Sequence, residues 1–219
     1  MEKEDTIKGK NVFAVNGFIT RAEREQKIGQ QSFTIWLTGL SASGKSTLSR
    51  ELERKLFGMD YLTYVLDGDN LRHGINCNLG FNCSDRKENI RRAAEIAKIL
   101  NSAGVICIVA LISPFVNDRE ISRTIIGSEQ FIEVYLNCCI EVCEQRDPKG
   151  LYKRARHGEV PDFTGIESPY EVPERPDVIV RTDKESPYEC VEKIINFLQR
   201  KNFINIQPCW LMINKTSQR

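Results

Sequence analysis

The 219-residue sequence lacks the features that mark several large classes of protein. Its 31 Lys and Arg residues nearly balance its 30 Asp and Glu residues, so the formal charge of +1 provides no general attraction for nucleic acid or membrane surfaces. The most apolar run, residues 105–112, is far too short to span a bilayer. The charged N-terminus has no apolar stretch typical of a secretory signal, and we therefore expect a cytoplasmic protein.

The cysteines do not have the spacings that are typical of metal ligands or of redox-active pairs. The sequence contains eight cysteines, but no two of them form a C-x-x-C pair. This favours reduced thiols, and Cys107 and Cys190 lie in apolar patterns typical of core residues. An alternative stays open, in which Cys77, Cys83 or Cys209 senses oxidants.

Internal repeats and low-complexity linkers are also absent. A hydrophobic content of 41% and a charged content of 28% suit one globular α/β domain with an ordinary polar surface. We assign residues 1–30 to an N-terminal extension, residues 31–203 to the domain, and residues 204–219 to a C-terminal tail.

The most informative feature that is present is a phosphate-binding motif. Residues 39–46 read G-L-S-A-S-G-K-S and match G-x-x-x-x-G-K-[ST], between a strand-like stretch at 33–38 and a helix-like stretch at 47–57. In this setting backbone N–H groups cradle phosphate oxygens, Lys45 reaches the β/γ-phosphates, and the Ser46 hydroxyl binds Mg²⁺. The motif therefore predicts binding of ATP with Mg²⁺.

Strand and helix patterns alternate along the rest of the sequence. Strands are predicted at 33–38, 61–66, 105–112, 131–136 and 178–180. Helices are predicted at 47–57, at 85–103 with Ser84 or Asp85 as the cap, at 117–126, and after Ser186, where S-P-Y-E combines a capping box with proline at its first position. This order predicts a three-layer P-loop NTPase fold, with a central five-stranded parallel sheet flanked by helices.

The stretch at about 148–176 breaks this alternation. It mixes Gly, Pro, charged and aromatic residues, and a loop of this length inside a compact domain is usually functional. Lys153, Arg154 and Arg156 suit a mobile lid that closes over anions and excludes water. A solvated basic surface loop is the alternative.

Acidic residues follow the second predicted strand. Asp67 and Asp69 lie two residues apart, at the end of a parallel strand where ligands bind. One carboxylate can accept the proton of an acceptor hydroxyl while the other organises Mg²⁺. The alternative is a solvated D-G-D turn.

Cationic and aromatic residues downstream suit an anionic acceptor with a base. Arg72, Arg86 and Asn89 lie near the same strand end, the last two on one face of a helix. Phe81 and Phe163 are aromatic residues in polar loops that can stack on a base, or alternatively plug the core.

Together these blocks resemble the adenylyl-sulfate kinases, which phosphorylate the 3′-hydroxyl of adenosine 5′-phosphosulfate (APS) to give PAPS. The matching blocks are W-L-T-G-L-S (36–41), D-G-D-N-L-R-H-G (67–74), L-G-F (79–81), D-R-K-E-N-I-R-R (85–92), I-S-P-F (112–115), C-E-Q-R-D (143–147), G-L-Y-K (150–153) and F-T-G (163–165). The resemblance covers roughly residues 11–200.

The resemblance implies a role for each matching residue. ATP would contact Gly39, Leu40, Ser41, Ala42, Ser43, Gly44, Lys45, Ser46, Thr47, Arg146, Thr182 and Asp183. APS would contact Asp69, Asn70, Arg72, Phe81, Arg86, Asn89, Ile112, Ser113, Lys153 and Phe163, with its adenine between the two phenylalanines. Lys45, Asp67, Asp69 and Ser113 would be catalytic, and Ser46 and Asp67 would hold Mg²⁺. The resemblance also implies a homodimer.

The sequence departs from the family pattern at a few places. Cys77-Asn78 stands where many members have a basic residue and aspartate, and Cys138-Cys139 replaces a commoner Ala-Pro. None of these changes touches the phosphate loop or the acidic pair. Two other functions stay open: a nucleotide or shikimate kinase with the same fold, and a non-catalytic domain that binds PAPS.

Overall fold

The computed structural model describes residues 17–205, which form a three-layer α/β fold around one sheet. The sheet has the strand order β2-β3-β1-β4-β5, and every neighbouring pair is parallel. The strands are β1 (Thr34–Thr38), β2 (Thr63–Asp67), β3 (Ile106–Ala110), β4 (Phe131–Leu136) and β5 (Val178–Val180). The predicted five-stranded parallel sheet is thus confirmed.

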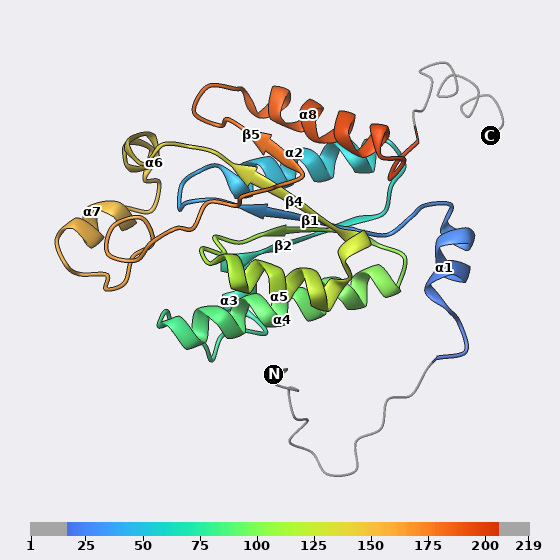
Figure 1. The fold of residues 1–219 in the computed structure, drawn as a ribbon, viewed down its shortest axis with the longest axis horizontal. Helices are drawn as coiled ribbons and strands as arrows, with labels where there is room; N and C mark the ends of the chain where they lie inside the picture. The colour runs from blue at the N-terminus through green and yellow to red at the C-terminus, as the bar shows by residue number, and fades with distance from the viewer. Residues whose placement is uncertain (1–16, 206–219) are drawn as a thin grey trace, which may run out of the picture.

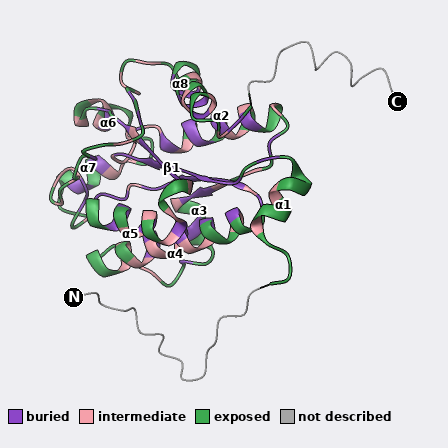
Figure 2. Ribbon diagram, turned by 45° about the vertical axis from the view of Figure 1, so that its right-hand side comes forward, coloured by how far each residue is buried: buried purple, intermediate pink, exposed green. Residues whose placement is uncertain are grey.

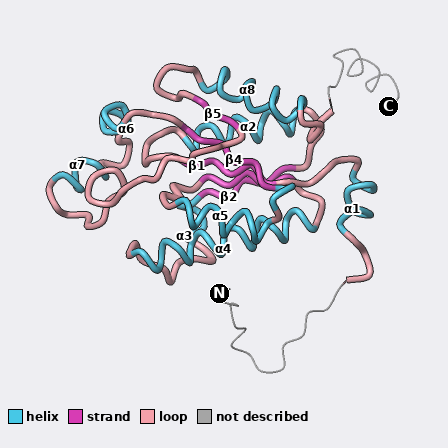
Figure 3. Tube along the Cα trace, viewed as in Figure 1, coloured by secondary structure: helices cyan, strands magenta, loops and turns pink. Residues whose placement is uncertain are grey.

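Helices cover both faces of this sheet (Figure 1). They are α1 (Arg21–Ile28), α2 (Lys45–Gly58), α3 (Gly68–His73), α4 (Cys83–Ser102), α5 (Val116–Ile126), α6 (Ile140–Arg146), α7 (Leu151–Arg156) and α8 (Pro187–Arg200), with a short 3₁₀ turn at Ser128–Gln130. Helices α2 and α8 lie on one face and α3, α4 and α5 on the other, while α6 and α7 project beyond the carboxyl ends of the strands (Figures 1 and 3).

Two apolar layers explain why the strands read as continuous hydrophobic runs. Every residue of β1 and β3 is buried, because the sheet carries helices on both faces (Figure 2). Leucines of α2 and the apolar face of α8 pack with the sheet in one layer, and alanines of α4 pack in the other. The helical spacing of these residues is the signal from which these three helices were predicted.

Helix caps were predicted with mixed success. Helix α8 has the predicted capping box: the Ser186 side chain accepts from the Glu189 N–H, and Glu189 accepts from the Ser186 N–H. For α4 the predicted cap at Ser84 or Asp85 is wrong, because Asn82 is the N-cap and accepts from the Asp85 N–H. Glu88 of the same helix pairs with arginines one turn ahead, and their hydrogen bonds hold its pKa at about 2.

Helix α1 lies in the stretch assigned to the N-terminal extension. Thr20 caps it through a capping box with Glu23, and Gly29 ends it in a left-handed conformation. Glu25 accepts hydrogen bonds from the Ser32 N–H and hydroxyl, and so ties the helix to the start of β1. Residues 1–16 and 206–219 lie outside the described residues, and they include Cys209 and all of the assigned tail except Ile204 and Asn205.

The stretch predicted as a long loop contains helix α7. Tyr152 and Ala155 of this helix are buried with Phe163, Cys138 and Cys143 in a small apolar cluster. The helix escaped prediction because its six residues are too few to display helical periodicity. Between residues 17 and 205, no helix is both long enough and apolar enough to cross a membrane.

The cysteines of the described region all have free thiols. Cys107, Cys138, Cys143 and Cys190 are buried, whereas Cys77, Cys83 and Cys139 are exposed. Burial raises the pKa of the Cys143 thiol to about 12 and that of Cys190 to about 11. The expected core positions of Cys107 and Cys190 are confirmed.

Candidate functional site

The phosphate loop connects the carboxyl end of β1 to the first turn of α2. Gly44 is the N-cap of α2 with a φ of 96°, a left-handed conformation that glycine adopts without strain. Gly39 lies so close to β4 that an added Cβ would come within 2.9 Å of the Leu136 carbonyl oxygen. Both glycines of the motif are therefore required by the backbone that presents N–H groups to phosphate.

Lys45 is buried within this loop. Its Nζ donates to the carbonyl oxygens of Gly39 at 2.9 Å and of Leu40 at 2.6 Å. Burial lowers the pKa of Lys45 to about 8, although the nearby Asp67 and Asp69 partly oppose this. The ammonium is thus held where a polyphosphate would lie. A bound anion would favour the charged form of Lys45, which burial disfavours.

Ser46 joins the loop to the second strand. Its hydroxyl donates to Asp67 Oδ2 at 2.6 Å, and Asp67 Oδ1 accepts from the Asp69 N–H at 3.0 Å. Asp67 is buried and caps α3, so its carboxylate has a fixed position. A hydroxyl and a carboxylate at this distance fit a Mg²⁺ ion, whose remaining ligands would be phosphate oxygens and water. The structure therefore brings the two predicted Mg²⁺ ligands together.

Asp69 is more exposed than Asp67 and forms an ion pair with Lys149. The contact joins the start of α3 to the segment between α6 and α7. Sequence reasoning did not select Lys149, although it lies in the same basic stretch as Lys153. No spacing signal indicates that one lysine of this stretch faces an aspartate 80 residues away.

Arg72 and Arg86, which were predicted to contact APS, are held by main-chain carbonyl groups. Arg72 donates to the carbonyl oxygens of Leu79 and Gly80, and its guanidinium lies 4.2 Å from the centre of the Phe81 ring. Arg86 donates to the carbonyl oxygen of Phe81.

Arg86 also reaches the segment predicted as a lid. It donates to the Asp162 carbonyl oxygen at 2.6 Å and to the Thr164 hydroxyl at 3.1 Å. The guanidinium of Arg86 therefore binds both the main chain at Phe81 and the residues on either side of Phe163. The two phenylalanines differ in exposure: Phe81 is 65% exposed, whereas Phe163 is buried edge-on against Tyr152, with ring centres 4.9 Å apart.

Ser113 lies in the turn that follows β3. Its φ of +40° is rare for a residue with a side chain. The Ser113 hydroxyl accepts a hydrogen bond from Trp36 Nε1 and donates one to Thr38 Oγ1, each at 3.0 Å. The neighbouring Ile112 carbonyl oxygen accepts from Thr38 Oγ1 at 2.8 Å.

The remaining predicted contacts with APS lie around α3, α4 and α7. Asn89 is buried and its Oδ1 accepts from Asn76 Nδ2 at 3.0 Å. Asn70 is exposed at the start of α3, and Lys153 is exposed on α7. Asn76 was not selected from the sequence, because an asparagine in a short loop carries no signal of its own.

The predicted contacts with the ATP base lie behind the phosphate loop. Arg146 donates to the Thr182 carbonyl oxygen at 2.5 Å, and the Thr182 hydroxyl donates to the Ser43 carbonyl oxygen at 2.7 Å. One carboxylate oxygen of Asp183 is buried without a hydrogen-bond partner. The structure thus places the segment after β5 directly beside the loop.

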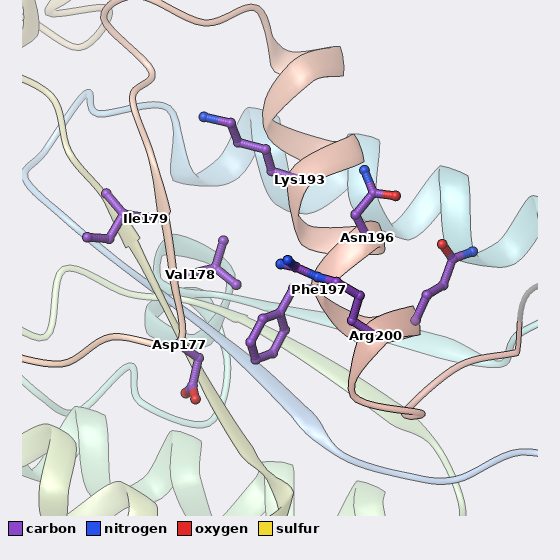
Figure 4. A pocket seen from close by; sticks show the side chains of 8 residues that line it. Asp177, Val178, Ile179, Lys193, Asn196, Phe197 and Arg200 are labelled. Atoms are coloured by element: carbon purple, nitrogen blue, oxygen red, sulfur yellow. The ribbon is translucent and has the colours of Figure 1, made fainter.

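A groove of about 710 Å³ lies elsewhere, between edge strand β5 and α8 (Figure 4). Val178 and Ile179 line it from the strand, and Phe197 and Arg200 line it from the helix. No residue of the phosphate loop or the acidic pair lines this groove, so it is separate from the site.

Comparisons with known proteins show the family of this chain. The family model for adenylylsulphate kinase matches residues 31–181. An adenylyl-sulfate kinase of Clostridium kluyveri is 51% identical over 195 residues, which is 89% of this chain and 98% of that protein.

Two solved structures are similar as well. The Mycobacterium tuberculosis APS kinase CysC in complex with AMPPNP and APS is 43% identical with a TM-score of 0.75, over 78% of this chain and 99% of that one. A hexameric APS kinase from Thiobacillus denitrificans is 27% identical with a TM-score of 0.63, over 85% of this chain and 33% of that one. The family model, the relative and the fold agree, and this chain belongs to the adenylylsulphate kinase family.

Proposed function

We propose that this protein transfers the γ-phosphoryl group of ATP to the 3′-hydroxyl of APS, giving PAPS and ADP in sulfate activation. The observation that carries the proposal is the 2.6 Å hydrogen bond between Ser46 and Asp67. It joins the phosphate loop to an acidic strand end, so a bound triphosphate and an acceptor hydroxyl would meet there. Membership of the family supports APS as the acceptor.

The donor side of this reaction uses residues 39–47. Their backbone N–H groups and the positive end of α2 would hold the phosphates, and Lys45 would exchange its carbonyl partners for phosphate oxygens. When bound between Ser46 and Asp67, Mg²⁺ would neutralise charge on the transferred group. Arg146, Thr182 and Asp183 would surround the ATP base.

The acceptor side supplies a base and a seat for APS. Asp67 or Asp69 would accept the 3′-hydroxyl proton while the O3′–P bond forms and the bond to the β-phosphate oxygen breaks, so that ADP leaves. Asn70, Asn89, Ile112 and Ser113 would line the seat. Phe81 and Phe163 would enclose the adenine, and Arg72, Arg86 and Lys153 would face the phosphosulfate.

Closure would complete this site. Phe163 now packs against Tyr152, and Arg86 joins Phe81 to the residues beside Phe163. We infer that residues 148–176 act as a lid, which would exclude water from the phosphoryl group. We also infer a homodimer and a cytoplasmic location; the related enzyme from Thiobacillus denitrificans is a hexamer, so the assembly is best measured by light scattering.

Acceptor specificity is the first test. Purified protein is incubated with ATP, Mg²⁺ and either APS, shikimate or a nucleoside monophosphate, and ADP release is measured. We expect turnover with APS and little with the others. Turnover of shikimate or a nucleotide without turnover of APS would refute the proposal.

A second test separates an enzyme from a domain that only binds PAPS. Lys45→Ala and Asp67→Asn variants are compared with the wild type for APS-dependent ADP release. Both are expected to lose most of it while keeping the wild-type circular dichroism spectrum. ADP release that persists in both variants would exclude catalysis by this site.

A further inference from the structure

Arg119 of α5 is a buried arginine that the proposed reaction leaves without a role. Its side chain is 2% exposed. Nη1 donates to the carbonyl oxygen of Ser113 at 2.8 Å, and Nη2 donates to the carbonyl oxygen of Glu171 at 2.8 Å. One guanidinium therefore joins the turn after β3 to the chain that returns from α7 toward β5.

The first partner of Arg119 belongs to the seat proposed for APS. Ser113 has a positive φ, a conformation that persists only where its surroundings hold it. Trp36 and Thr38 hold the Ser113 side chain, while Arg119 holds the main chain of the same residue. Loss of the Arg119 contact would free the carbonyl group to rotate and would move the hydroxyl with it.

The second partner of Arg119 lies at the carboxyl end of the proposed lid. The Glu171 N–H donates to the Pro114 carbonyl oxygen at 2.8 Å, and Glu171 Oε2 accepts from the Val116 N–H at 2.7 Å. The Tyr170 hydroxyl lies 2.9 Å from Thr38 Oγ1, so it meets the same threonine as Ser113. This end of the lid is thus anchored to the Ser113 turn.

A buried carboxylate balances the charge of Arg119. Glu133 of β4 lies 2.8 Å from Arg119 Nε and 3.6 Å from Arg123 Nη2. Burial raises the pKa of Glu133, and the two arginines oppose that rise. Arg123 thus shares the carboxylate as an ion pair, but its hydrogen bond goes to the Phe131 carbonyl oxygen, and its guanidinium lies 4.6 Å from the centre of the Phe131 ring. It donates neither to Ser113 nor to Glu171. Arg123 is therefore a matched control for Arg119.

We propose that Arg119 is a positioning residue for APS, which fixes the Ser113 turn and anchors the end of the lid to it. The inference rests on the proposed function, because it assumes that Ser113 lines the APS seat. Arg119 would act through two carbonyl oxygens without touching the substrate. Its loss should therefore weaken APS binding more than ATP binding.

Steady-state kinetics and Trp36 fluorescence test this role. Sequence position 210 holds the other tryptophan, so a Trp210→Phe background isolates Trp36, whose Nε1 donates to Ser113. In Arg119→Gln we expect the KM for APS to rise roughly ten- to hundredfold, with the KM for ATP changed less than about twofold. Trp36 emission should change in Arg119→Gln. Arg123→Gln is the control for the KM alone, because its guanidinium lies over Phe131, a ring that itself packs against Trp36.

If Arg119→Gln folds poorly, the same question can be tested with Arg119→Lys and Tyr170→Phe. Lysine keeps the charge beside Glu133 but cannot match the planar fork that reaches both carbonyl oxygens, so the KM for APS should stay raised. Tyr170→Phe removes only the hydroxyl beside Thr38 and should raise this KM by about two- to fivefold. A wild-type KM for APS in Arg119→Lys, or equal effects in Arg119→Gln and Arg123→Gln, would overturn the proposal.

The fluorescence arm separates this inference from the proposed function. Trp36 reports the position of Ser113 whether or not the protein phosphorylates APS. If the wild type failed to turn over APS, the proposed function would fail on its own. Unchanged Trp36 emission in a folded Arg119→Gln variant would refute the coupling to Ser113, whatever the activity.

Discussion

The donor side and the acceptor side of the site are built in opposite ways. The proposed donor side would take its phosphate-facing groups from residues 39–47, which form the loop after β1 and the first turn of α2. The proposed acceptor side would collect side chains from three separate segments, residues 67–89, 112–113 and 149–164. Arg86 and Thr164, which are hydrogen-bonded there, lie 78 residues apart in the sequence.

The two sides also hold their charges differently. Lys45 is buried and bonded to carbonyl groups of its own loop, whereas the acceptor-side contacts of Arg72 and Arg86 are partly exposed. A guanidinium that pairs with neutral carbonyl oxygens gains energy by exchanging them for phosphate or sulfate oxygens. The cations of both sides would thus exchange carbonyl oxygens for anionic oxygens, but Lys45 would do so while buried in its own loop, and Arg72 and Arg86 while partly exposed.

Removal of the donor-side charge should have the largest effect. Lys45→Met keeps an unbranched side chain but leaves the transferred phosphoryl group without its ammonium. We expect kcat to fall about 10²–10³-fold in a coupled assay of ADP release. The control is Lys55→Met on the same helix, which loses only a surface pair with Glu192 and should keep wild-type kcat. A fall of less than about threefold for Lys45→Met would show that the loop alone is sufficient.

The two phenylalanines can separate a contribution to APS binding from a contribution to the stability of the fold. Phe81→Ala and Phe163→Ala should each raise the KM for APS roughly tenfold, the loss expected for one stacked ring. Only Phe163→Ala should destabilise the fold, by about 3 kcal/mol in urea unfolding, because Phe163 is buried and Phe81 is exposed. Equal stabilities of the two variants would show that the Phe163 cluster contributes nothing to the folded state.

The buried charge of Lys45 should appear as a pH dependence of stability. The folded protein releases this proton near pH 8, whereas the unfolded chain keeps it to about pH 10.5. The unfolded chain therefore binds more protons between these values, and the free energy of unfolding should rise with pH there by about 1–3 kcal/mol relative to Lys45→Met. Urea unfolding of both proteins at pH 7.5, 9 and 10 measures the difference. A constant difference would refute the lowered pKa.

Salt should produce the smallest effect and should distinguish charge from stacking on the acceptor side. Arg72, Arg86 and Lys153 are expected to face the phosphate and sulfate, so the Kd for APS should rise roughly threefold between 50 and 250 mM NaCl. Adenosine carries no charge, and its Kd should stay nearly constant over the same range. Calorimetric titration measures both constants. Equal salt dependence would place the anions away from these side chains.

Much of the fold could be predicted because its signals are local. Continuous apolar strands and helices with four-residue spacing predicted the parallel sheet, and the S-P-Y-E sequence predicted the start of α8. The cap of α4 was wrong because Asn82, Ser84 and Asp85 all suit a cap, and their tertiary setting decided among them. Asp85 instead accepts hydrogen bonds from the Gly80 N–H and from Asn82.

The sequence alone determined the phosphate loop between β1 and α2, because a strand, a glycine-rich turn and a helix that follow one another bring their groups together wherever they occur. Only the tertiary structure decided that Lys149 meets Asp69 and that Arg119 joins Ser113 to Glu171. Lysines and arginines occur throughout the surface of most proteins, and their spacing does not reveal which of them face a site. Their roles arise from contacts between segments that the fold brings together from distant parts of the chain.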